Sequence, residues 1–179
     1  MIALPEPHQS LPARMPGRAQ AVAVVVCLVG VAPAVAWAAH AVLGLRLQPV
    51  AWTGATAWIQ GAGAGFMAWA WVLALAPALE EFAMRPLLQT GLRHQLERIR
   101  TAGSGNSPDW LGHLANAGSA LVFALLHLPA NGVLALWWAL PALAIGEVWR
   151  RSASWGLCTL LHAWFNTSLA VVTLLYSLP

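Results

Sequence analysis

Charge is the scarcest property of this chain: 8% of its 179 residues are charged, against about 25% in an ordinary soluble domain. Hydrophobic residues make up 59% of it. A water-soluble fold could not bury that much apolar surface, so the composition predicts an integral membrane protein. Lysine is absent and the nine basic residues, all arginine, form no long basic run. This pattern excludes a nucleic-acid-binding surface and indicates a lipid bilayer as the partner.

Cysteine and the common hydrolase motifs are also scarce or absent. The two cysteines, Cys27 and Cys158, lie in apolar stretches without a CxxC spacing, which excludes a disulfide framework and a cysteine-based zinc site. We expect both to be buried as small hydrophobic residues. The chain contains neither a Gly-x-Ser-x-Gly nor a His-Glu-x-x-His motif, so an ordinary serine hydrolase or zincin is not indicated.

The long apolar stretches predict an all-α, polytopic bundle of about five transmembrane helices. These stretches lie at residues 19–45, about 65–91, 111–128, 133–148 and 155–178. A glycine-rich lead before residue 65 indicates an additional re-entrant or interfacial segment.

The ends and loops complete this organisation. Four prolines predict a flexible cytoplasmic tail at residues 1–18, followed by a single transmembrane domain at residues 19–179. Ala36-Trp37-Ala38 resembles a signal cleavage site, but the first apolar stretch is too long for a signal peptide, so we expect an anchor. Residues 93–110 are expected to form a polar loop outside the membrane. Seven of the nine arginines fall on one side of this topology, which predicts a multi-pass inner-membrane protein with a cytoplasmic N-terminus.

The first motif is Glu80-Glu81-Phe82-Ala83-Met84-Arg85, which places three charges inside an apolar helix. Such charges are costly in a membrane and indicate a functional site. Glu81 and Arg85 are four residues apart, in the favourable order for an ion pair, while Glu80 is rotated about 100° away. The alternative is a helix end whose charges are solvated at the membrane interface.

Two further motifs place polar residues one helical turn apart. Phe123 and His127 share one helical face before a proline-containing turn, and His162 and Asn166 share a face of the last apolar helix. Each pair alone is equally consistent with hydrogen bonding between helices.

Together, the three motifs provide what amide hydrolysis requires. A glutamate can accept a proton, a histidine can position water, and a His/Asn pair can donate hydrogen bonds to one oxygen. We expect no metal. The alternative is a zinc site of Glu80, His127 and His162, whose separate helices leave its geometry unconstrained.

The segments EEFAMR, FALLH and HAWFN resemble, in the same order, the three motifs of the CAAX-processing and bacteriocin-processing (CPBP, or Abi) family of glutamate-dependent intramembrane proteases. The resemblance covers residues 65–170, as in a compact bacterial member. It implies that Glu80 and His127 activate water and that His162 and Asn166 stabilise the oxyanion. It further implies that Glu81 and Arg85 brace the site. The motifs themselves leave the substrate class open, and we expect a membrane-anchored protein or peptide, such as one with a C-terminal sorting tail.

Two other functions compete with this interpretation. One is a noncatalytic membrane protein of the same fold, such as an immunity factor or assembly partner, in which the polar residues serve helix packing. The other is a transporter with an ion relay through Glu81, Arg85 and Glu147. The chain shows no repeated halves, and Glu147 is expected at the interface beside Arg150 and Arg151.

Overall fold

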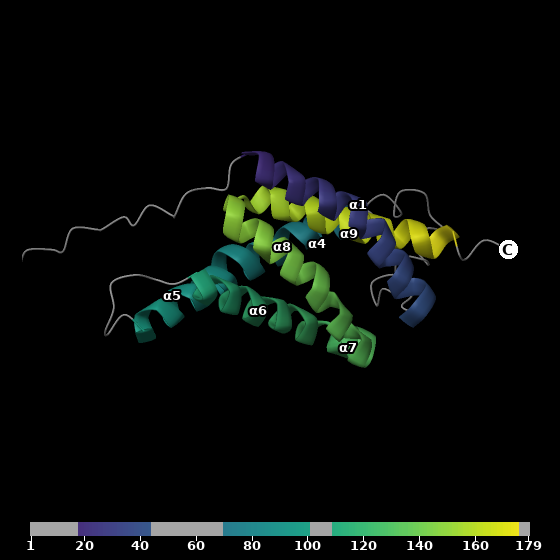
Figure 1. The fold of residues 1–179 in the computed structure, drawn as a ribbon. Coiled ribbons are helices and arrows are strands. Elements are labelled where there is room, and N and C mark those ends of the chain that lie inside the picture. Colours follow the sequence, from purple (N-terminus) through teal and green to yellow (C-terminus); the bar gives the residue numbers. More distant parts are fainter. Residues whose placement is uncertain (1–17, 44–69, 101–108, 176–179) are drawn as a thin grey trace, which may run out of the picture.

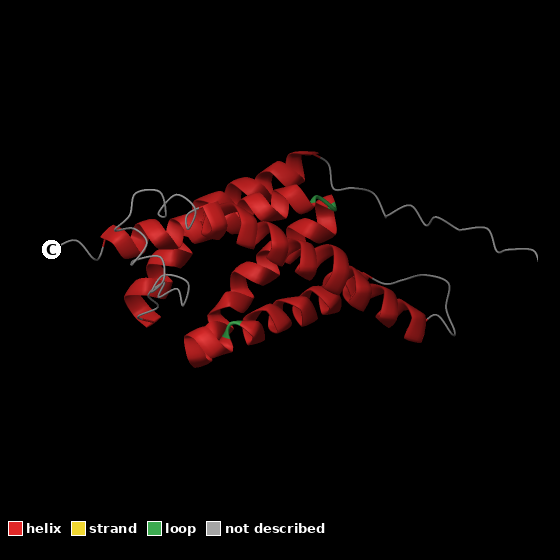
Figure 2. Ribbon diagram, turned by 180° about the vertical axis from the view of Figure 1, so that it is seen from behind, coloured by secondary structure: helices red, strands yellow, loops and turns green. Residues whose placement is uncertain are grey.

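The computed structural model describes residues 18–43, 70–100 and 109–175, and nearly all of these are helical (Figure 1, Figure 2). The described elements are, in chain order, α1 (Arg18–Leu43), the π-helix η1 (Trp71–Leu75), α4 (Ala76–Phe82), the π-helix η2 (Ala83–Gln89), α5 (Thr90–Arg100), α6 (Asp109–Leu126), α7 (Leu128–Asn131), the 3₁₀-helix η3 (Gly132–Trp138), α8 (Ala139–Ser152) and α9 (Trp155–Leu175). The predicted all-α class is confirmed for this part of the chain.

Five long helical segments within the described ranges correspond to the five predicted apolar stretches. Residues 70–100 run without a break through η1, α4, η2 and α5, and η3 continues directly into α8. Among the described residues, one helix, Gly132–Ser152, is long and apolar enough to cross a membrane, and Leu28–Val42 is a shorter apolar helix. The number of membrane spans therefore stays a prediction.

The loop expected at residues 93–110 is wrong in its first half, because residues 93–100 form most of α5. This segment contains no proline or glycine, and the Arg93 Nε atom donates a hydrogen bond of 2.9 Å to Glu97 one turn later. Such pairs stabilise an exposed helix. The predicted tail before Arg18 and the re-entrant segment before residue 65 lie outside the described residues.

Small side chains allow the helices to approach each other closely. α1 lies along α9, and its alanines at positions 32, 36 and 39 are buried on one face. Ala36 packs with Leu169 and Val172 of α9. Close packing of small residues is the usual basis of helix association in membranes.

The described surface is far more apolar than that of a soluble domain, and the mainly apolar interior also contains polar side chains. Large apolar side chains such as Val133, Leu140 and Leu160 are exposed, whereas a set of polar side chains is buried. The buried polar set comprises Glu81, Arg85, Gln89, Asn116, Ser119, His162 and Ser168. An apolar exterior of this extent suits contact with lipid.

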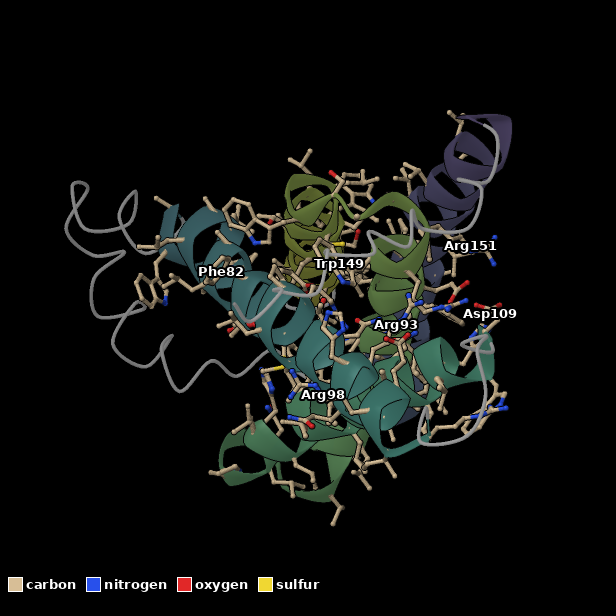
Figure 3. The ribbon with its side chains drawn as sticks, turned by 90° about the vertical axis from the view of Figure 1, so that its left-hand side faces the viewer. Phe82, Arg93, Arg98, Asp109, Trp149 and Arg151 are labelled. Carbon is tan, nitrogen blue, oxygen red and sulfur yellow. The ribbon has the colours of Figure 1, made fainter. Side chains whose placement is uncertain are left out.

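Apart from Glu80, most of the described charged residues outside this interior gather at one end of the bundle. Figure 3 looks onto this end, where Arg93 and Arg98 of α5, Asp109 of α6 and Arg151 of α8 are labelled. Arg150 bridges α8 and α6 through a hydrogen bond of 3.0 Å from its Nη1 atom to Asp109 Oδ1. We name this region, α5 with Asp109 and the last two turns of α8, the charged end.

Glu147 belongs to the charged end and lies beside Arg150 and Arg151, as expected. It accepts hydrogen bonds of 2.8 Å from Arg150 Nε and 2.7 Å from Arg151 Nε. Both arginines lie on the same helix as Glu147, about one turn beyond it.

Candidate active site

The glutamate motif lies where the helix changes its winding. Glu80 and Glu81 belong to α4, and Arg85 lies in the π-helix η2 together with Pro86. Proline lacks the N–H that an α-helix needs at this position, so a regular ladder of hydrogen bonds cannot continue through it. Short π-helical turns of this kind are frequent at functional sites.

Glu81 and Arg85 form the predicted ion pair. The Arg85 Nε atom lies 2.7 Å from Glu81 Oε2, and the side chains are 0% and 1% exposed, respectively. A buried charge pair is tolerated only when its remaining hydrogen-bonding groups are also satisfied. Each of the other two guanidinium nitrogens also has an acceptor: Nη1 donates to Gln89 Oε1 over 3.2 Å and Nη2 to the Ala142 carbonyl over 3.0 Å.

His162 of α9 lies between the two glutamates. Its Nδ1 atom is 2.9 Å from Glu81 Oε1, and its Nε2 atom is 3.5 Å from Glu80 Oε2. A carboxylate oxygen accepts hydrogen bonds, so Nδ1 is the protonated nitrogen when Glu81 is ionised. This hydrogen bond orients the ring and directs Nε2 toward Glu80.

Glu80 differs from its neighbour in exposure. Its side chain is 39% exposed, whereas that of Glu81 is 1% exposed. A rotation of about 100° between adjacent helical residues accounts for the difference. Of the two carboxylates, Glu80 is therefore the one that a substrate or water molecule can approach.

The Phe123 ring of α6 contacts both motif histidines. Its centroid is 4.5 Å from that of His127 and 5.7 Å from that of His162. His127 Nδ1 donates a hydrogen bond of 2.8 Å to the Phe123 carbonyl, which can only accept. In the neutral imidazole this leaves His127 Nε2 as an acceptor.

Asn166 lies one turn beyond His162 on α9 and is half-buried. The motif residues of α4, η2, α6 and α9 are thus linked through His162 and Phe123.

The described residues contain no group of three or more His, Cys, Asp or Glu side chains placed to hold a metal ion. The expectation of no metal, with its zinc alternative of Glu80, His127 and His162, stays a prediction.

Sequence reasoning missed a second layer of buried polar residues around Arg85. Gln89 lies one turn beyond Arg85, and this spacing could have identified it. Ser119 donates a hydrogen bond of 3.0 Å to the Met84 carbonyl, and Asn116 one of 3.0 Å to the Leu143 carbonyl. These contacts cross between helices distant in sequence, so no local pattern reveals them.

A comparison with protein families decides the relationship that the three motifs indicate. The model of the family described as Type II CAAX prenyl endopeptidase Rce1-like matches residues 61–168, more than half of the chain. The chain belongs to this Rce1-like family. No curated protein and no solved structure gives a significant match.

The Rce1-like match spans all three motifs, from Glu80 to Asn166. The predicted family resemblance is therefore confirmed, and with it membership of a protease family. The membrane character of the Rce1-like family also agrees with the apolar helix Gly132–Ser152.

Proposed function

We propose that this protein is an intramembrane endopeptidase that hydrolyses a peptide bond in a membrane-anchored protein or peptide, such as one with a C-terminal sorting tail. Family membership supports peptide-bond hydrolysis. The observation that carries the catalytic assignment is the position of His162, which lies 2.9 Å from the buried Glu81 and 3.5 Å from the more exposed Glu80.

In this proposal Glu80 is the general base. It is the accessible carboxylate of the pair, and both oxygens of Glu81 already have partners in Arg85 and His162. Glu80 accepts a proton from water while the water oxygen attacks the peptide carbonyl carbon. His127 Nε2 accepts a hydrogen bond from the same water, since its Nδ1 atom donates to the Phe123 carbonyl.

His162 and Asn166 stabilise the oxyanion that forms on the carbonyl oxygen. The Asn166 amide donates through its N–H group, and His162 donates through Nε2–H when the ring is in its imidazolium form. The Glu81 carboxylate at Nδ1 stabilises this imidazolium. The C–N bond then breaks, and the proton held by Glu80 passes to the leaving amine nitrogen. The mechanism draws on side chains alone.

The first test compares C-terminal peptides in native membranes by mass spectrometry. Cells expressing the wild type are compared with cells expressing Glu80→Gln at equal levels. Glu97→Gln is the matched control, because Glu97 lies on the same continuous helix but belongs to the charged end.

We expect specific truncated C-termini in the wild type and in Glu97→Gln, and their loss in Glu80→Gln, since an amide cannot accept the proton from water. Those termini would identify the cleavage site. Termini that persist in Glu80→Gln would refute the assignment of Glu80. If no terminus depends on the wild-type protein, the noncatalytic interpretation gains support.

A further inference from the structure

The hydrogen bonds around Arg85 extend beyond the three motifs into α8. Gln89 is 3% exposed, and it joins two partners: its Oε1 atom accepts from Arg85 Nη1, while its Nε2 atom donates to the Gly146 carbonyl over 3.1 Å. Arg85 Nη2 donates to the Ala142 carbonyl, one turn earlier on α8. Arg85 and Gln89 are therefore docked side by side on one stripe of the α8 backbone.

Gly146 makes this close docking feasible. A β-carbon at Gly146 would lie 2.7 Å from Arg85 Nη1 and would overlap Asn116 Oδ1. Asn116 is buried, and its amide nitrogen is held by the Leu143 carbonyl. Asn116 and Arg85 thus both lie too close to Gly146 to admit a β-carbon, and any larger residue must displace both of them.

The position of Arg85 in turn determines the orientation of Glu81. Its Nε atom binds Glu81 Oε2, which leaves Oε1 for His162 Nδ1. The chain of contacts therefore runs from the α8 backbone through Gln89 and Arg85 to Glu81 and His162.

We propose that Gln89 and Gly146 are positioning residues, which hold Arg85 and Glu81 so that His162 is protonated at Nδ1 and directs Nε2 toward Glu80. This role rests on the proposed function, because it serves catalysis only if Glu80 and His162 act on a substrate. Neither residue belongs to the three motifs. Both act through Arg85 and are not catalytic residues themselves.

The matched pair of variants is Gly146→Ala and Gly112→Ala. Gly112 lies in α6, where the three atoms nearest to an added β-carbon all belong to the flexible Arg150 side chain. Gly112→Ala therefore introduces the same methyl group between α6 and α8 without disturbing Arg85. Gln89→Met is a second test variant, which keeps the length of the side chain but removes both of its hydrogen bonds.

The readout is the ¹⁵N NMR spectrum of histidine-labelled protein in nanodiscs, with the His162 signals assigned from a His162→Gln spectrum. We expect a protonated Nδ1 in the wild type and in Gly112→Ala. The hydrogen-bond partner of a histidine ring selects its tautomer. In Gly146→Ala and Gln89→Met the Glu81 carboxylate is no longer held in place as the acceptor for Nδ1. The spectra of these two variants should therefore contain the signal of an unprotonated His162 Nδ1.

A wild-type His162 spectrum in folded Gly146→Ala and Gln89→Met would overturn the proposal. If Gly146→Ala does not fold, Gln89→Met alone decides it. The measurement needs no turnover, so its result is independent of whether Glu80→Gln abolishes cleavage. Once a cleaved peptide is known, Gln89→Met should lower kcat roughly 10- to 100-fold while KM stays nearly constant, because misplacement affects the chemical step.

Discussion

Glu80 and Glu81 are adjacent in sequence but have different surroundings. Glu81 is held by Arg85 and His162 and is almost completely buried, while Glu80 contacts His162 at longer range and is partly exposed. The two carboxylates therefore contribute differently. Removal of the Glu81 carboxylate should affect mainly the stability of the fold, and removal of the Glu80 carboxylate mainly the rate of peptide hydrolysis.

We predict that Glu81→Gln lowers the free energy of unfolding by about 3–5 kcal/mol, because it leaves the buried Arg85 charge without its counter-ion. Glu80→Gln should lower it by less than about 1 kcal/mol, since its side chain is partly exposed and glutamine is nearly isosteric. Thermal unfolding in detergent, followed by intrinsic tryptophan fluorescence, compares the two variants. Equal melting temperatures would contradict the division of roles.

At the scale of elements, α6 and α8 are joined at two levels. Deep in the bundle, Asn116 of α6 binds the α8 backbone, and at the charged end Arg150 of α8 binds Asp109. Asn116 is buried, whereas Asp109 is 81% exposed and screened by solvent. The ion pairs of the charged end should therefore contribute little to the free energy of unfolding, and this small contribution should depend on pH.

The hydrogen bond from Arg150 lowers the pKa of the Asp109 carboxyl. A carboxyl group whose pKa is lower in the folded than in the unfolded protein stabilises the fold. This stabilisation is fully present above the unfolded pKa of roughly 3.9, and it is lost as the pH falls through the folded pKa. We predict that Asp109→Asn destabilises the protein by less than about 1 kcal/mol at neutral pH. The difference from wild type should shrink as the pH approaches about 3.

Melting temperatures of the wild type and Asp109→Asn, measured across this pH range, check the prediction. Glu97→Gln serves as a control for the loss of one carboxylate elsewhere at the charged end. A difference between wild type and Asp109→Asn that does not change with pH would show that the ion pair is not its cause.

For the whole molecule, the location of the charged end bears on membrane orientation. Arg93, Arg98 and Arg151 gather at one end of the bundle, and α7 lies at the other (Figure 1, Figure 3). Clustered arginines favour the cytoplasmic side. We therefore propose that the charged end faces the cytoplasm, as does the N-terminus.

Cysteine labelling with a membrane-impermeant maleimide tests this orientation. The exposed positions are Arg98→Cys at the charged end and Val133→Cys near α7, each in a background with Cys27 and Cys158 replaced by alanine. We expect Arg98→Cys to react in inverted vesicles and Val133→Cys to react in intact spheroplasts. The reverse pattern would invert the topology, and labelling of both from one side would contradict a spanning arrangement.

The sequence alone determined the membrane class, the five helical segments and the motif residues. It could do so because apolar runs and spacings of four residues are local properties of a helix. The Glu81–Arg85 pair, the burial of Cys158 and the place of Glu147 beside Arg150 and Arg151 followed from the same kind of pattern. The extent of α5 was missed, because a polar composition was taken as evidence of a loop although exposed helices are also polar.

Only the tertiary structure decided how the motifs meet. His162 could have faced either glutamate or neither, and its place between Glu80 and Glu81 depends on how α9 packs against α4. The docking of Arg85 and Gln89 on α8 depends likewise on Gly146, which has no side chain. The need for glycine at this position cannot be recognised until the helix that packs against it is known. The physical reason is that spacing along a helix determines which residues share a face, whereas the partner of that face is selected by packing between segments distant in the chain.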